Sequence, residues 1–137
     1  MNAQEIREQF ERQRKIREKR KRIGESVEKH MTWLYNQLEI IDDSEFNKFA
    51  LAGKVMMRIS TLEENEENFR ELVLLPEFDD PNRYSAYSKS YVAPIETKKF
   101  SVETEFINQF LQAGVDFVSV PRNDPACLFV VIFIDKK

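Results

Sequence analysis

The chain has 137 residues, of which 42% are hydrophobic and 33% are charged, so it is long enough to bury one core. A single cysteine excludes an internal disulfide, and one cysteine with one histidine offers too few ligands for a thiolate–imidazole zinc site. The longest apolar run, residues 127–134, is too short to span a bilayer. We therefore expect a soluble cytoplasmic protein that has no cofactor and no membrane contact.

The charge is divided unevenly along the chain. Residues 1–30 hold ten Lys or Arg and six Asp or Glu, a net of +4, whereas residues 31–137 hold eleven and eighteen, a net of −7. Most of the bases fall in the segment "ERQRKIREKRKR". The sequence therefore predicts a basic arm, residues 1–26, attached to an acidic body, residues 27–137.

The first forty residues contain no proline and are predicted to form one long helix, with Asn2 and Glu5 as a capping box. Apolar residues form a stripe only in its second half, at Val27, Met31, Leu34, Leu38 and Ile41. This stripe can pack on the protein's own core or serve as a dimer seam, and both interpretations stay open. Gly24 lies where the two halves meet and is a candidate hinge.

Three short elements are expected next. Asp42 and Glu45 form a second capping box, which predicts a short helix that ends near Gly53. The alternation in residues 54–60 favours a strand. Residues 61–75 are ambiguous because Thr61 could begin a helix, but we expect a turn and then a strand that pairs with 54–60 as a hairpin.

Residues 76–100 are rich in Pro, Ser and Tyr and are predicted to form a long functional or mobile loop, with only "YVAPI" as a short edge strand. Its tyrosines, Tyr84, Tyr87 and Tyr91, are candidate partner contacts, because rigid aromatic area binds at low entropic cost. Bases of a nucleic acid could also stack on these rings. The alternative is that the tyrosines simply cover the sheet.

The end of the chain has clearer patterns. Ser101 can cap a helix that ends at Gly114, and "VDFVSV" alternates as a half-buried strand. The run "CLFVVIFI" is typical of a central strand that is covered on both faces. Together these elements predict an α+β fold, in which a long N-terminal helix precedes a small, mostly antiparallel sheet with helices on one face.

The basic segment is the main candidate for function. Lysine and arginine neutralise phosphates and release counterions, so a basic helix can bind nucleic acid without reading its sequence. The same helix could dock on an acidic protein surface, or it could be a solvent-exposed helix whose charged side chains form ion pairs with one another. The candidate contacts are Arg12, Arg14, Lys15, Arg17, Lys19, Arg20, Lys21 and Arg22.

A weaker pattern lies near the C-terminal end. Glu105, Asp124, Asp135 and Lys137 follow an order that resembles the PD-(D/E)xK nucleases, although the sequence reads "NDP" and Lys137 is the last residue. The resemblance implies that the carboxylates would hold a divalent metal ion and that the lysine would assist the attacking water. The lone histidine, His30, has no Ser or Cys at a suggestive spacing, so we expect an ordinary surface or partly buried side chain.

The sequence as a whole favours a small non-enzymatic binding protein, an accessory or inhibitory factor. It would use the basic arm to engage nucleic acid or a nucleoprotein complex, and it would also contact a protein partner. One alternative is an assembly subunit whose long helix docks on protein partners or forms a homo-oligomer. The metal-dependent nuclease is the other alternative.

Overall fold

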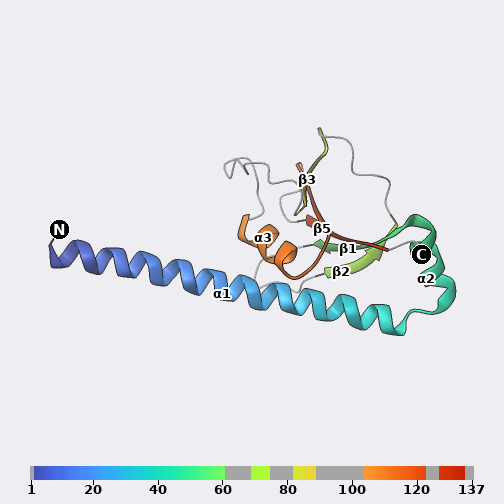
Figure 1. Ribbon diagram of the computed structural model, residues 1–137, viewed down its shortest axis with the longest axis horizontal. Helices are drawn as coiled ribbons and strands as arrows, with labels where there is room; N and C mark the ends of the chain where they lie inside the picture. The colour runs from blue at the N-terminus through green and yellow to red at the C-terminus, as the bar shows by residue number, and fades with distance from the viewer. Residues whose placement is uncertain (1, 61–68, 75–81, 89–103, 123–126, 135–137) are drawn as a thin grey trace.

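A computed structural model of the chain describes residues 2–60, 69–74, 82–88, 104–122 and 127–134. The helices are α1 (Ala3–Ile40), α2 (Asp43–Ala52) and α3 (Thr104–Gln112). The strands are β1 (Lys54–Ser60), β2 (Phe69–Val73), β3 (Tyr84–Ser88), β4 (Phe117–Pro121) and β5 (Cys127–Phe133). The predicted α+β fold with a long N-terminal helix is confirmed (Figure 1).

Helix α1 projects far beyond the rest of the molecule (Figure 1). Its 38 residues correspond to about 57 Å at 1.5 Å per residue. It begins as the capping box predicts, because Asn2 Oδ1 accepts the backbone N–H of Glu5 at 2.9 Å. The helix runs through Gly24 without interruption, so the candidate hinge is an ordinary helical position.

The two halves of α1 differ in burial as their sequences suggest. Every side chain from residue 2 to residue 22 is exposed, and Ile23 is the first buried one. Burial then continues along the predicted stripe at Val27, Met31 and Leu34. Residues 11–22 contain a single apolar residue, Ile16, so no apolar stripe extends from the core along the first half of the helix.

Helix α2 has both of the ends that its sequence predicts. Asp42 Oδ1 accepts the backbone N–H of Glu45 at 2.8 Å, which satisfies one of the free donors of the first turn. Gly53 ends the helix with φ of +73°, a left-handed conformation that glycine adopts without a steric cost. Only Phe49 of this helix is buried.

The five strands form one sheet in the order β2-β1-β5-β4-β3, and every neighbouring pair is antiparallel. Strands β1 and β2 form the predicted hairpin, with Met57 opposite Leu72. Strand β5 is the middle strand and is buried on both faces, as its uninterrupted apolar sequence predicts. On one face Leu128 and Val130 are buried, and on the other Phe129 and Val131.

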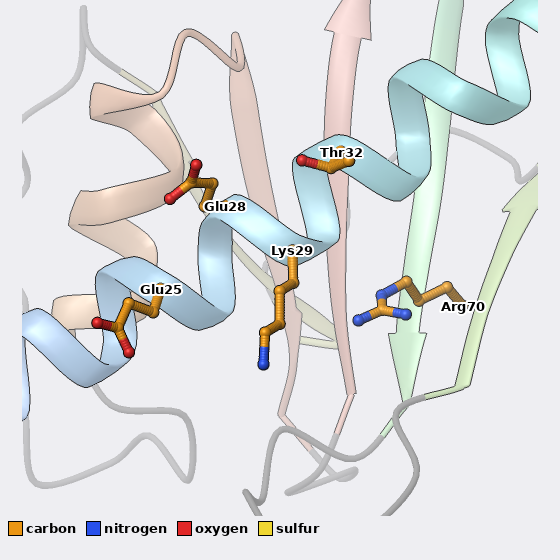
Figure 2. Close-up of a pocket in the computed structure, with 5 residues that line it drawn as sticks. All are labelled: Glu25, Glu28, Lys29, Thr32 and Arg70. Carbon is orange, nitrogen blue, oxygen red and sulfur yellow. The ribbon is translucent and has the colours of Figure 1, made fainter.

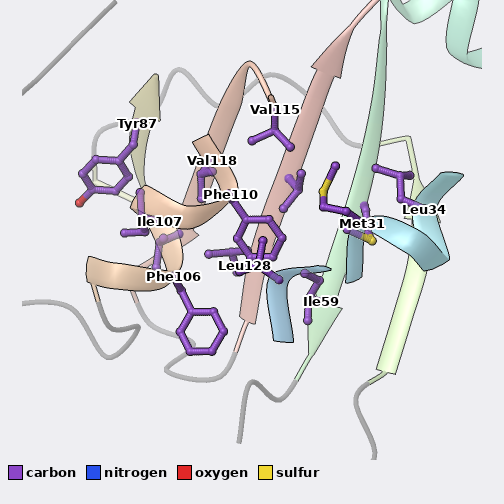
Figure 3. Packing of buried hydrophobic residues seen from close by; sticks show 14 of the residues in the cluster. Met31, Leu34, Ile59, Tyr87, Phe106, Ile107, Phe110, Val115, Val118 and Leu128 are labelled. Carbon is purple, nitrogen blue, oxygen red and sulfur yellow. The ribbon is translucent and has the colours of Figure 1, made fainter. Parts of the chain in front are cut away.

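One face of the sheet and the helices enclose the main core. The register sets Met57 beside Val130, Val130 beside Val118, and Val118 beside Tyr87, so these side chains form one row on that face. Helix α3 covers the row with Ile107 and Phe110, and α1 covers it with its own buried stripe (Figure 3). The prediction that the helices pack on one face of the sheet is therefore confirmed.

The predicted loop 76–100 is wrong in one part, because residues 84–88 form strand β3. Burial alternates along this strand, with Ser85 and Tyr87 facing inward, so its inward positions are not marked by aliphatic residues. An alternating pattern of Tyr, Ser and Ala carries little of the hydrophobic signal by which strands are recognised. The expected edge strand "YVAPI", Tyr91 and Ser101 lie outside the described residues.

Candidate nucleic-acid interface

The predicted contact residues of the basic arm all lie on the exposed half of α1. At 3.6 residues per turn their side chains point in all directions around the helix rather than along one side. Arg12, Lys15, Arg17 and Lys21 make no ion pair with the described part of the chain. A straight helix that carries bases around its whole circumference can approach a polyanion from any side.

Two of the arginines are held by carboxylates. Arg14 lies between Glu11, at 2.8 Å, and Glu18, at 3.8 Å, both within α1. Arg20 reaches Glu105 of α3 at 3.9 Å, an ion pair that joins the arm to the rest of the molecule. Because the Arg14 and Arg20 side chains are about two-thirds exposed, such pairs contribute little stability and can exchange for an outside anion.

The tyrosines do not join the arm to form one surface. Tyr87 is only 6% exposed, and this burial raises the pKa of its phenol above the ordinary value. Its place in the core removes it from the candidate contacts. Tyr84 lies on the opposite face of β3 and packs edge-on against Phe129, with ring centroids 6.2 Å apart. The alternative interpretation, in which tyrosines cover the sheet, describes these two residues.

The structure corrects the expectation for His30, which is fully buried where α1 meets β2 and α3. Arg70 of β2 donates its Nε–H to His30 Nδ1 at 2.7 Å. The imidazole proton must therefore sit on Nε2, 3.4 Å from the hydroxyl oxygen of Ser26. The ring of Phe110 lies against the histidine at a centroid distance of 6.0 Å.

This environment keeps the imidazole neutral. Burial, and then the positive charge of Arg70, lower the pKa of His30 from 6.5 to about 4. A histidine that serves as a general base needs access to substrate and a pKa near the working pH, and His30 has neither. Its hydrogen bond with the partly exposed Arg70 of β2 instead links α1 to the sheet.

An open depression with a volume of about 550 Å³ lies beside this junction, along the exposed surface of α1 and next to Arg70 of β2. Its walls are formed by Glu25, Glu28, Lys29, Thr32 and Arg70. Lys29 and Arg70 lie on the same side of α1, and the guanidinium of Arg70 points from β2 toward the helix (Figure 2). The negative charges of the two glutamates balance the positive charges of Lys29 and Arg70, so the depression has no net charge that would favour a cation or an anion.

The residues that resemble a nuclease pattern are mostly outside the described part of the chain, which excludes Asp124, Asp135 and Lys137. Glu105 is described, and its carboxylate accepts the side-chain amide of Gln109 at 3.0 Å while it pairs with Arg20. Among the described residues, no group of three or more His, Cys, Asp or Glu is arranged to hold a metal ion.

Comparisons of this chain with protein-family models, curated proteins and solved structures find no match. Within the described residues, no helix combines the length and the apolar character that a membrane crossing would require.

Proposed function

We propose that this is a small non-enzymatic binding protein that engages nucleic acid, or the nucleic acid of a nucleoprotein complex, through its basic arm. The single observation that carries the proposal is the exposure of the whole segment from Asn2 to Arg22 on a projecting helix. Bases on such a helix remain hydrated and accessible, so they can neutralise phosphates and release counterions at little desolvation cost.

The division of charge supports the same function. The acidic body, with its net charge of −7 over residues 31–137, would be repelled by the phosphates that attract the arm. The repulsion would limit contact to the arm and orient the body away from the nucleic acid. The free, buried Cys127 is compatible with a reducing compartment, and we propose a cytoplasmic location on this ground.

The proposal is tested by the salt dependence of binding to a labelled DNA duplex and a labelled RNA. The full-length chain is compared with the double variant Arg12→Gln and Lys15→Gln, which removes two exposed arm charges. The slope of log affinity against log salt should fall in magnitude by about two, because each lost phosphate contact contributes about 0.9.

A matched control removes two exposed charges from the body, with Lys48→Gln and Arg122→Gln, and should leave the slope unchanged. Failure of the full-length protein to bind either nucleic acid at low salt would reject the proposal. An equal change of slope in the arm variant and the body variant would show that the arm is not the contact.

A further inference from the structure

The uncovered side of α1 carries one continuous line of side chains, which we call the outer stripe. At 3.6 residues per turn its members fall within about 80° of arc. All of them are exposed, and the body packs on the other side of the helix (Figure 1). The outer stripe consists of Ala3, Arg7, Phe10, Arg14, Arg17, Lys21, Glu25, Glu28, Thr32, Tyr35 and Glu39.

The charge of the outer stripe reverses near the middle of the helix. All its charged residues up to Lys21 are basic, and all of those from Glu25 onward are acidic. Each half also exposes one aromatic ring, since Phe10 is 64% exposed and Tyr35 is 50% exposed. A helix with these two halves is complementary to a second copy of itself that runs in the opposite direction.

We propose that two copies of this chain associate through their outer stripes, antiparallel, about a twofold axis near residues 22 and 23. In this register Arg17 faces Glu28 of the second copy, and Lys21 faces its Glu25. Phe10 meets Tyr35 of the second copy near each end. Because the twofold axis repeats every contact, each pairing occurs twice.

Other arrangements of the same two helices place like charges together. A parallel pair would set each outer-stripe base opposite its own copy, so Arg17 would face Arg17 and Lys21 would face Lys21. An antiparallel pair displaced by about one turn keeps two kinds of opposite-charge contact, Arg17 with Glu25 and Arg14 with Glu28, but it places Lys21 opposite Lys21 at the axis. The proposed register has three kinds of opposite-charge contact, since Arg7 also faces Glu39, and it has no like-charge contact. Charge therefore opposes the parallel pair and favours the proposed antiparallel register over the displaced one.

The aromatic pairs and the ion pairs would contribute differently. Phe10 and Tyr35 would bury apolar area and provide most of the attraction, as aromatic anchors do in protein interfaces. The charged pairs would stay near water and mainly fix orientation, so the dimer should weaken as salt rises. Arg12 and Lys15 lie off the stripe and would remain free for nucleic acid.

The proposal is tested on the full-length chain without nucleic acid, by sedimentation at several protein concentrations and two salt concentrations. A monomer–dimer equilibrium that weakens with salt is expected. Arg17→Glu alone and Glu28→Arg alone should each weaken dimerisation about tenfold, because each reversal places like charges together twice. The combined variant should restore dimerisation, whereas Lys15→Glu, a matched reversal outside the stripe, should have no effect.

The register is tested by oxidative cross-linking. The pair Arg14→Cys with Thr32→Cys, which face each other in the proposed register, should yield a covalent dimer under a mild oxidant. The pair Arg14→Cys with Glu28→Cys, which reports the displaced register, should not, and both pairs keep Phe10 and Tyr35. Cys127 is 2% exposed and does not compete. A monomer at every concentration, no restoration in the charge swap, or cross-linking only through position 28 would overturn the proposal, whether or not the arm binds nucleic acid.

Discussion

Protonation of His30 should be the most specific acid-sensitive event in this protein. The imidazole is fully buried, and its Nδ1 accepts a hydrogen bond from Arg70, so a second proton would place a buried imidazolium beside the positive charge of the Arg70 guanidinium. The pKa of His30 is lowered from 6.5 to about 4. Between pH 6.5 and about pH 4, His30 therefore binds a proton in the unfolded chain but not in the folded chain.

The sign and the size of the effect follow from this difference. Because the folded-state pKa lies below the unfolded value, the stabilisation is fully present above pH 6.5 and is lost as the pH falls toward 4. At about 1.4 kcal/mol per pH unit, the loss amounts to about 3 kcal/mol. That is a large share of the total stability of about 5–15 kcal/mol that is usual for a domain.

The measurement is the free energy of unfolding by urea for the natural chain and for His30→Gln, at a series of pH values between about 7 and 4. Carboxylates also titrate in this range, but they are common to both proteins and cancel in the difference. The stability advantage of the natural chain over the variant should shrink by about 3 kcal/mol across the range. A difference that does not change with pH would refute the reasoning.

Three further substitutions test how the fold is built. Gly24→Ala should raise the free energy of unfolding by about 0.5–1 kcal/mol, because alanine favours a helix and an added Cβ would lie no closer than 3.7 Å to its neighbours. Gly114→Ala should lower the free energy of unfolding, because the backbone φ of +103° at this position strains any residue with a Cβ. Asp42→Ala should lower the free energy of unfolding in urea by about 1 kcal/mol, because the helix cap is lost. The control Asp43→Ala removes the same charge but not the cap, so it should lower the free energy of unfolding clearly less. Phe110→Ala, at a fully buried position, should cost about 3–5 kcal/mol and lower the melting temperature, and a small change would show that α3 is not part of the core.

The elements that sequence reasoning recovered are those with a strong local signature. The α2 helix was found because Asp42 and Gly53 mark its ends by side-chain and backbone chemistry that needs no distant partner. Strand β5 was found because a continuous apolar run must be covered on both faces wherever it lies in a sheet. The exposure of the arm followed from the absence of an apolar stripe.

The features that were missed depend on residues far apart in the chain. Strand β3 has Ser85 and Tyr87 as its inward residues, and only pairing with β4 reveals that both are buried. The burial of His30 depends on Arg70, which is forty positions away and belongs to another element. A lone histidine on a predicted helix therefore gave no sign of the contact that fixes α1 on the sheet.

The outer stripe is not defined by the sequence alone. A helix with bases around its circumference has several possible lines of side chains, and only the packing of α1 on the sheet establishes which side stays uncovered. Along that side the charge reverses between residues 21 and 25.

The account depends most on the claim that the arm, rather than the body, contacts nucleic acid. Lysine acetylation followed by mass spectrometry, with and without bound DNA or RNA, tests this claim residue by residue. Bound nucleic acid should slow the modification of Lys15 and leave that of Lys48, an exposed lysine of α2, unchanged. Equal rates at Lys15 with and without nucleic acid, or protection of Lys48 alone, would contradict the account.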